Sequence, residues 1–230
     1  MLLLSLLFFA SVSAAEEAQG DLRTLVSGNT AFAFELYSKL KGTEGNLFFS
    51  PYSISSALAM TYAGAKRDTA NEMAETLNFQ LDGEKTHRAF DELNKVFEEI
   101  EGRGAVELHI ANSLWRQKGY PFLPAYLSLL EKCYGVAVTP VDYVKAAEQA
   151  RMTINSWVRE KTKEKIKEII GSGFLTPETM LVLVNAIYFK GKWKAEFDPN
   201  HTAPADFTLS SGHKTRVSMM YQKGMFGYRW

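Results

Sequence analysis

The chain has 230 residues, of which 46% are hydrophobic, and its 26 basic side chains balance its 26 acidic ones. This length and apolar content allow one large domain or two small ones. Because the net charge is zero, the chain as a whole lacks the basic excess of nucleic-acid-binding or membrane-surface proteins, although a local patch is compatible with these numbers.

The single cysteine, Cys133, excludes an internal disulfide framework, and no Cys/His cluster has the spacing of a zinc site. We interpret Cys133 as a small core residue near a helix end, with a reactive thiol as the alternative. The four histidines lie far apart on unlike predicted elements, so solvated or hydrogen-bonded histidines are favoured over metal ligands. The sequence therefore predicts no metal and no cofactor.

The first residues have the pattern of a secretory signal peptide. Residues 2–10 are apolar but too short to span a bilayer, and small residues suited to cleavage follow, although a positively charged start is missing. We predict cleavage after Ala14 or Ala15 and an exported, extracellular protein, with residues 16–28 as an N-terminal extension. No second apolar segment has the length of a transmembrane helix.

The next segments carry clear helix signals. Apolar side chains recur at helical spacing over residues 33–40, and Gly42 supplies the stop. Residues 46–50 indicate a short strand. Ser50 followed by Pro51 predicts an N-cap and a first helical position, so a helix rich in small residues begins there and ends at Gly64.

Two further helices are predicted before the first long strand. Thr69 and Glu72 form a capping box for a short helix through Leu77. Residues 86–100 form an amphipathic helix in acidic surroundings, with six acids against four bases between residues 84 and 103.

Strands and helices then alternate. Residues 106–110 alternate apolar with polar side chains and predict a half-buried strand that extends towards Trp115. A helix is expected over residues 122–134, ended by Gly135, and a strand over residues 136–143.

A long helix is predicted from residue 146 to residue 169, because apolar residues keep a helical period throughout. Its last turns carry many lysines, but opposite charges recur three residues apart, as in Glu160 with Lys163, Lys161 with Glu164, and Lys165 with Glu168. We interpret this face as solvated and ion-paired, with a polyanion site as the alternative.

Residues 181–189 are the most apolar run of the chain. The run is short and uncharged, and Gly191 follows, so a strand buried on both faces is favoured over a buried helix. Asn185 is a polar amide in its middle, and burial without partners would cost about 1–3 kcal/mol. We therefore predict that Asn185 meets other polar groups in the core.

The last part of the chain predicts a hairpin. Residues 207–209 and 215–219 are strand-like, with Ser211-Gly212 as the turn. Asn200-His201-Thr202 is a candidate glycosylation site, although such triplets also arise by chance. No internal repeat or linker divides the chain into independent domains.

Sequence patterns of catalysis are absent. The chain has no nucleophile elbow, no HExxH, and no glycine-rich phosphate loop, and it displays no Ser-His-Asp set that would support a hydrolase. The residues alone indicate a secreted mixed α/β protein that is not an enzyme.

Three motifs resemble one family. Residues 46–65 (Asn-Leu-Phe-Phe-Ser-Pro-Tyr-Ser-Ile-Ser-Ser-Ala-Leu-Ala-Met-Thr-Tyr-Ala-Gly-Ala) are similar to the signature strand and helix of the serpins. Residues 183–193 (Leu-Val-Asn-Ala-Ile-Tyr-Phe-Lys-Gly-Lys-Trp) resemble their central sheet strand. Asn155-Ser156-Trp157, with Thr162 and Lys165-Ile166 following, resembles the helix that lies across that sheet.

The resemblance runs in family order from residue 29 to the end, and it implies a partial serpin domain over residues 29–230. The implied fold is α+β, with many helices around a large mixed or antiparallel central sheet. By motif match, Ser50, Ser53 and Asn185 fall on the family's shutter, the buried polar cluster beneath the sheet. Trp193 matches the tryptophan of the breach, where loop insertion begins.

The implied activity is inhibition of serine, and sometimes cysteine, proteases. An exposed reactive loop is cleaved as a substrate and inserts into the main sheet while still acylated to the protease. The alternative is a non-inhibitory serpin that acts as a carrier or folding factor. The family's heparin-binding members carry a basic version of the 86–100 helix, so heparin activation is not expected here.

The reactive loop and its hinge lie beyond the equivalent of Trp230 in the family. The sequence therefore predicts that this chain includes no reactive-site bond, does not inhibit a protease by itself, and self-associates through unpaired strands.

Overall fold

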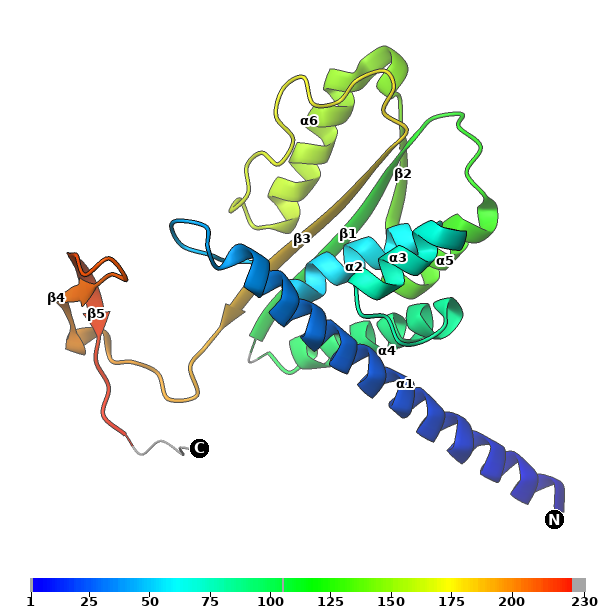
Figure 1. Cartoon of the computed structure of the whole chain (residues 1–230), viewed down its shortest axis with the longest axis horizontal. Helices are drawn as coiled ribbons and strands as arrows, with labels where there is room; N and C mark the ends of the chain where they lie inside the picture. The colour runs from blue at the N-terminus through cyan, green and yellow to red at the C-terminus, as the bar shows by residue number, and fades with distance from the viewer. Residues whose placement is uncertain (1, 105, 225–230) are drawn as a thin grey trace. The chain divides into compact units, whose positions relative to one another are not determined.

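The computed structural model describes residues 2–104 and 106–224, and the chain separates into two compact units, one up to Phe189 and one from Lys190. The first unit contains the helices α1 (Leu2–Leu40), α2 (Pro51–Tyr62), α3 (Arg67–Thr76), α4 (Gly83–Gly102), α5 (Pro124–Tyr134) and α6 (Tyr143–Lys161) (Figure 1). No helix among the described residues combines the length and apolar character needed to cross a membrane.

A three-stranded sheet carries these helices. Its strands are β1 (Val106–Gln117), β2 (Ala137–Val141) and β3 (Leu181–Gly191), in the order β2-β1-β3. β1 and β2 are parallel, with Ser113 opposite Ala137. The Gln117 N–H at the end of β1 donates to the Met180 carbonyl just before β3 at 2.8 Å, so β1 and β3 run antiparallel.

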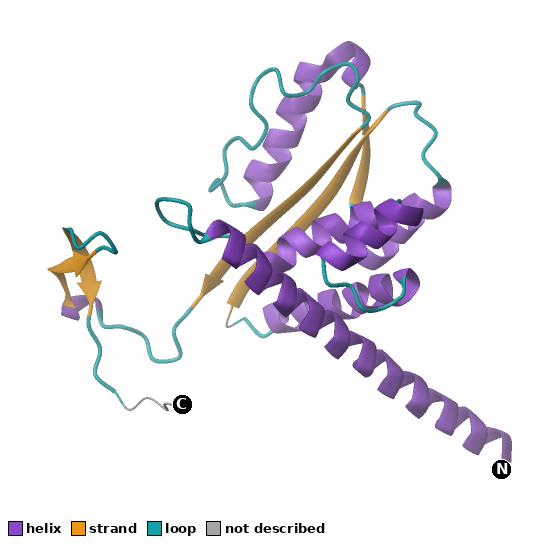
Figure 2. Ribbon diagram, viewed as in Figure 1, coloured by secondary structure: helices purple, strands orange, loops and turns teal. Residues whose placement is uncertain are grey.

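The two faces of the sheet have separate cores. Leu114 packs with α1 to α5, in a cluster that includes Met60, Phe90 and Leu130. The next residue, Trp115, packs on the other face beneath α6. Successive side chains of a strand point to opposite faces, so β1 contributes to both cores. Figure 2 shows α6 set apart from the other helices, with the strands between them.

Local signals set two helix boundaries as predicted. Ser50 is the N-cap of α2, and its Oγ accepts a hydrogen bond from the Ser53 N–H at 3.3 Å, with Pro51 at the first helical position. Gly135 ends α5 in the left-handed conformation, at φ 60°.

Two predictions for the N-terminal half are wrong. Residues 46–50 form no strand and instead lead as a loop into α2. The predicted capping box is absent, because α3 begins at Arg67 after Lys66 and places Thr69 inside the helix.

The predicted long helix is also wrong in its extent, because α6 ends at Lys161. Lys163 and Glu164 take positive φ values of 49° and 63°, which turn the chain away from the helix axis. Asn155 then holds the returning segment, since its Oδ1 accepts hydrogen bonds from the N–H groups of Ile169 and Ile170 at 3.0 Å each.

The ion pairs of this segment differ accordingly from the predicted spacing. Lys163 pairs with Glu107 on β1 at 2.5 Å, and Glu168 pairs with Arg151 at 2.5 Å. The charged face is therefore ion-paired in two ways. Lys163 and Glu168 pair with residues outside the segment, whereas Arg159 with Glu164 at 3.8 Å and Lys161 with Glu160 at 3.5 Å pair within it.

Strand β3 is less buried than predicted. Val184 and Ala186, on the face that α6 covers, are buried, whereas Asn185 and Ile187, on the other face, are half-buried. The reason is position, because among the described residues β3 is an edge strand that pairs only with β1.

Helix α1 continues through the predicted N-terminal extension. Leu25 is buried in the core of the first unit. At Gly28 an added Cβ would lie 2.2 Å from the Asn78 carbonyl oxygen, so only glycine allows this close approach. Part of residues 16–28 is therefore packed structure.

The second unit contains the predicted hairpin. β4 (Thr202–Thr208) pairs antiparallel with β5 (Lys214–Met220), with Gly212 at φ 80° in the turn. A short 3-10 helix, η1 (Pro199–His201), precedes β4, and β4 begins five residues earlier than predicted.

Candidate functional site

Three polar side chains meet between α2 and the sheet. The Ser53 Oγ donates a hydrogen bond to the Asn185 Oδ1, and the Asn185 Nδ2 donates to the Asn112 Oδ1 at 2.6 Å. Ser53 is 4% exposed and Asn112 is 7% exposed. We call this chain of contacts the Ser53–Asn185–Asn112 junction, and it joins α2, β3 and β1.

The sequence brings these groups together for identifiable reasons. Helix α2 carries small side chains on its buried face, including Ser53, Ser56 and Ala59, so the helix can lie close to the sheet. The antiparallel register of β1 and β3 then places Asn112 opposite Asn185. The amide of Asn185 thus has partners inside an apolar strand, which removes the cost of burying it unpaired.

Ser50 is not part of the junction but bonds to the backbone of Ser53. Its contact is the N-cap bond to the Ser53 N–H, and it fixes the helix turn from which the Ser53 side chain projects. The sequence reasoning named Ser50, Ser53 and Asn185 but missed Asn112. The signal was present, because Asn112 is a polar residue within the strand predicted to run towards Trp115.

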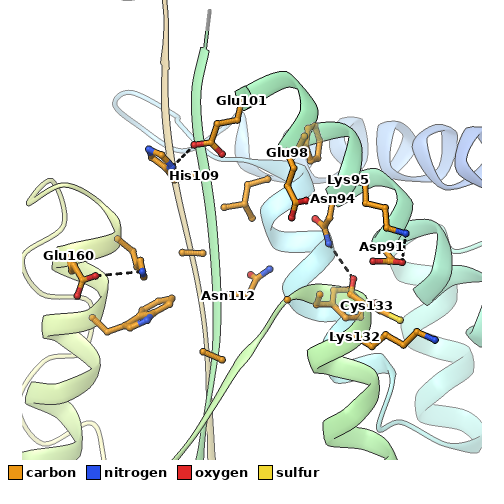
Figure 3. Close-up of a pocket in the computed structure, with 18 of the residues that line it drawn as sticks. Asp91, Asn94, Lys95, Glu98, Glu101, His109, Asn112, Lys132, Cys133 and Glu160 are labelled. Atoms are coloured by element: carbon orange, nitrogen blue, oxygen red, sulfur yellow. Dashed lines mark hydrogen bonds and ion pairs between the residues drawn. The ribbon is translucent and has the colours of Figure 1, made fainter. Parts of the chain in front are cut away.

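A cavity of about 780 Å³ lies beside the junction, where Asn112 forms part of its wall. Figure 3 shows Asn94 from α4 and Cys133 from α5 at the same cavity. The Asn94 Nδ2 donates to the Cys133 carbonyl at 3.3 Å, and its Oδ1 accepts from the Tyr52 hydroxyl at 2.6 Å. These contacts tie α2, α4 and α5 together beside the sheet.

Cys133 is a buried free thiol near the end of α5, as predicted. Burial raises the pKa of the Cys133 thiol, with a smaller contribution from the negative charge of Asp91. A thiol held protonated is a poor nucleophile, which disfavours the reactive alternative.

His87 is a second buried titratable group. Its Nδ1 lies 2.6 Å from the Tyr134 hydroxyl oxygen, so it belongs to the hydrogen-bonded histidines. Burial lowers the pKa of His87 to about 4. Among the described residues, no group of three or more His, Cys, Asp or Glu side chains could hold a metal ion.

Two predicted site residues lie in the second unit. Trp193 is 65% exposed and packs edge-to-face on Phe197, with ring centroids 5.7 Å apart. Asn200 is exposed in η1, and its Nδ2 donates to the Asp198 Oδ1 at 3.0 Å. The contact with Phe197 is within the second unit, so the place of Trp193 in the breach remains a prediction from the sequence motif.

The chain is similar to known proteins of one family. Residues 27–230 match the family described as "Serpin (serine protease inhibitor)". Leukocyte elastase inhibitor A of Mus musculus is 45% identical over 210 residues, which cover 90% of this chain and 54% of that protein. Leukocyte elastase inhibitor of Homo sapiens is 43% identical with the same coverage.

A solved structure shares the fold. Ovalbumin from emu (Dromaius novaehollandiae) superposes with a TM-score of 0.80 at 30% identity, and the match covers 87% of this chain and 55% of that one. The chain therefore spans about half the length of the relatives that it matches.

Proposed function

The chain belongs to the serpin family, and on this premise we propose that the whole protein is a serine protease inhibitor of the suicide-substrate kind. Inhibition in this family means capture of a protease, not turnover of a substrate, so we assign no catalytic residue to the chain.

The Ser53–Asn185–Asn112 junction supports this proposal most directly. It holds the edge strand β3 to β1 and to α2 through hydrogen bonds between neutral side chains. Such contacts position the strand but can exchange with other polar groups when the sheet rearranges. A cleaved loop that adds beside β3 would gain backbone hydrogen bonds along the strand edge.

We assign Ser50, Ser53 and Asn185 to the family's shutter, and Trp193 to its breach. The contacts of Ser53 with Asn185 support the first assignment, because they lie where α2 meets β3. The exposed indole of Trp193 supports the second, because a site of strand entry has to be accessible.

For the target we propose a serine protease of the elastase type, with a cysteine protease as the second class to test. The support is the name of the relatives at 43–45% identity, leukocyte elastase inhibitor. The decisive experiment incubates the whole protein with elastase-, chymotrypsin- and trypsin-type enzymes and with a papain-type enzyme, followed by denaturing electrophoresis.

A covalent complex with an elastase-type enzyme that survives denaturant is the expected result. The alternative function, a carrier or folding factor, gives a different outcome. In that case the proteases cleave the protein without forming a complex, and cleavage leaves its melting temperature unchanged.

We propose that the protein is exported after cleavage at Ala14 or Ala15, and that Asn200 carries a glycan. The apolar residues 2–10 and the exposed position of Asn200 support this. Mass spectrometry of the protein from its native host should find Ala15 or Glu16 at the N-terminus. Recovery of intact Met1 from the cytosol would contradict the export. An Asn200→Gln variant that loses no glycan-sized mass would contradict the glycosylation.

We also propose that heparin does not activate this protein through α4. The support is the acidic surroundings of that helix, whose two lysines are both paired with acids, Lys95 with Asp91 and Glu92, and Lys85 with Glu17. Heparin should leave the rate of complex formation unchanged, and an acceleration lost after Lys85→Ala and Arg88→Ala would contradict this.

A further inference from the structure

The chain leaves α6 through a turn that buried groups define. Thr162 is 1% exposed, and its Oγ1 donates to the Val158 carbonyl at 2.8 Å and accepts from the Ile166 N–H at 3.1 Å. Lys163 and Glu164 follow in the left-handed region, which non-glycine residues rarely occupy. The position of the Lys163 backbone is therefore fixed by the fold around it.

The Lys163 side chain reaches two strands from this turn. Its Nζ lies 2.5 Å from the Glu107 Oε2 on β1 and 4.9 Å from the centre of the Tyr188 ring on β3. An ammonium group near an aromatic face is attracted by the electron density of the ring. A single side chain thus contacts both members of the β1–β3 pair.

The contacts continue to the end of α4. Tyr188 stacks on His109, with ring centroids 5.8 Å apart and an angle of 28° between the rings. The His109 Nδ1 lies 2.8 Å from the Glu101 Oε1 in the last turn of α4, as Figure 3 shows. α6, β3, β1 and α4 are connected in series at this end of the sheet.

This set of contacts lies on the opposite face from the Ser53–Asn185–Asn112 junction. Glu107 and His109 are an odd number of residues from Asn112 along β1, and Tyr188 is three residues from Asn185 along β3, so their side chains point the other way. The β1–β3 pair is held by α2 on one face and by Lys163 on the other.

From this geometry we propose that Lys163 is a positioning residue that latches the β1–β3 pair to the C-terminal end of α6 and slows the shift of these strands beneath the helix. The proposal rests on the proposed function in one respect, because the shift matters for inhibition only if a loop adds beside β3. The latch itself is a property of the native fold and can be measured without a protease.

The first test is hydrogen–deuterium exchange of the whole native protein and of three variants. Lys163→Ala should raise exchange about two- to five-fold in peptides covering residues 162–175 and 181–189, since exposed ion pairs and ring contacts have modest energies. Lys163→Arg keeps the charge and should restore the native rates. Lys165→Ala removes an exposed lysine two residues away and should change nothing.

Equal exchange in Lys163→Ala and the native protein would overturn the proposal. So would an increase that Lys165→Ala reproduces or that Lys163→Arg does not reverse, because either result indicates a general effect on the turn. The melting temperatures of all variants are measured in parallel. If Lys163→Arg lowers the melting temperature as much as Lys163→Ala does, the variants simply destabilise the protein, and the proposal is overturned.

The second test follows complex formation with an elastase-type protease. Lys163→Ala should form the complex at least about two-fold faster than the native protein, because the strands shift more readily. If the native protein forms no complex, the proposed function fails and the exchange experiment still decides on the latch. If the complex forms at the same rate in both, the latch has no role in inhibition.

Discussion

Asn185 shows how one side chain can hold a strand in three directions. Its carbonyl oxygen accepts from Ser53 on α2, its amide nitrogen donates to Asn112 on β1, and its backbone belongs to β3. A leucine at this position would fill the space but would leave Ser53 and Asn112 without these partners. The polar choice therefore specifies where β3 lies relative to α2.

Removing the donor at Ser53 tests this directly. We expect Ser53→Ala to lower the free energy of unfolding by about 1–2 kcal/mol, because the Asn185 oxygen loses its hydrogen bond in a half-buried site. Ser38→Ala, on an exposed position of α1, is the control and should be nearly neutral. Urea denaturation followed by fluorescence measures both, and equal midpoints would show that the contact contributes nothing.

His87 makes the stability of the first unit depend on pH. It is 5% exposed, and its ring packs against Tyr62 and Tyr134 with centroids 5.8 Å from each. Burial lowers the pKa of His87 from 6.5 to about 4 in the folded state. The unfolded chain therefore binds a proton at this residue at higher pH than the folded chain does.

The sign follows from this order of pKa values. Stability from the neutral His87 is complete above about pH 6.5 and is lost as the pH falls from about 6.5 to about 4, with an upper estimate of about 3 kcal/mol. His87→Gln should flatten this part of the stability curve, whereas the exposed His213→Gln should leave it as it is. Identical pH profiles for native protein and His87→Gln would contradict the assignment.

At the scale of single elements, α6 and the segment after it depend on one buried amide. The Asn155 Oδ1 accepts from the Ile169 and Ile170 N–H groups, and its Nδ2 donates to the Ile170 carbonyl at 2.9 Å. These three bonds stabilise residues 163–170, a segment that forms no regular helical hydrogen bonds after the one from the Thr162 N–H to the Val158 carbonyl at 2.9 Å. They explain why a segment with helical periodicity folds back along α6.

Asn155→Ala should cost about 2–3 kcal/mol, because the backbone groups of Ile169 and Ile170 lose their partner. Ser156→Ala, at the neighbouring exposed position, should cost little and serves as the matched control. Limited proteolysis is the second measurement, since the released segment should be cut faster between residues 163 and 173. Resistance equal to that of Ser156→Ala would argue against this role.

Boundaries with a local cause could be predicted from the sequence, and those with a distant cause could not. Pro51 and Gly135 determine their own backbone angles, so the start of α2 and the end of α5 were both predicted. The end of α6 depends on Asn155 and on strained angles at Lys163, which helical periodicity does not report. The partner of Asn185 on β1 was missed for the same reason, because strand register is set by tertiary contacts.

At the scale of the whole molecule, the three-stranded sheet has two edge strands among the described residues, β2 and β3. Among the described residues β3 pairs with β1 on one side only, so residues 181–189 present a strand edge on the other side. The family was predicted from sequence motifs, and with it the α+β fold of helices around a sheet. The half-burial of β3 was not, because a run of apolar residues does not reveal how many neighbours a strand has.

We expect a polypeptide restricted to residues 16–230 to self-associate through this edge. Exposed apolar side chains on the hairpin, such as Phe207 and Met220, add to the tendency. Light scattering across a dilution series should show dimers or larger species. A proline at Ile187, which removes a donor from β3, should reduce association relative to Ile187→Val, and a monomer at all concentrations would contradict the expectation.

The junction also has a consequence in time. Ser53 and Asn185 are separated by 132 residues along the chain. A ribosome that adds about 5–20 residues per second delivers Asn185 roughly 7–26 s after Ser53. During synthesis α2 is therefore made before the partner of its serine exists, and the last helix of the first unit, which ends at Lys161, is made before β3 begins at Leu181. Chaperones that bind exposed apolar surface would meet this nascent form with an unfinished sheet.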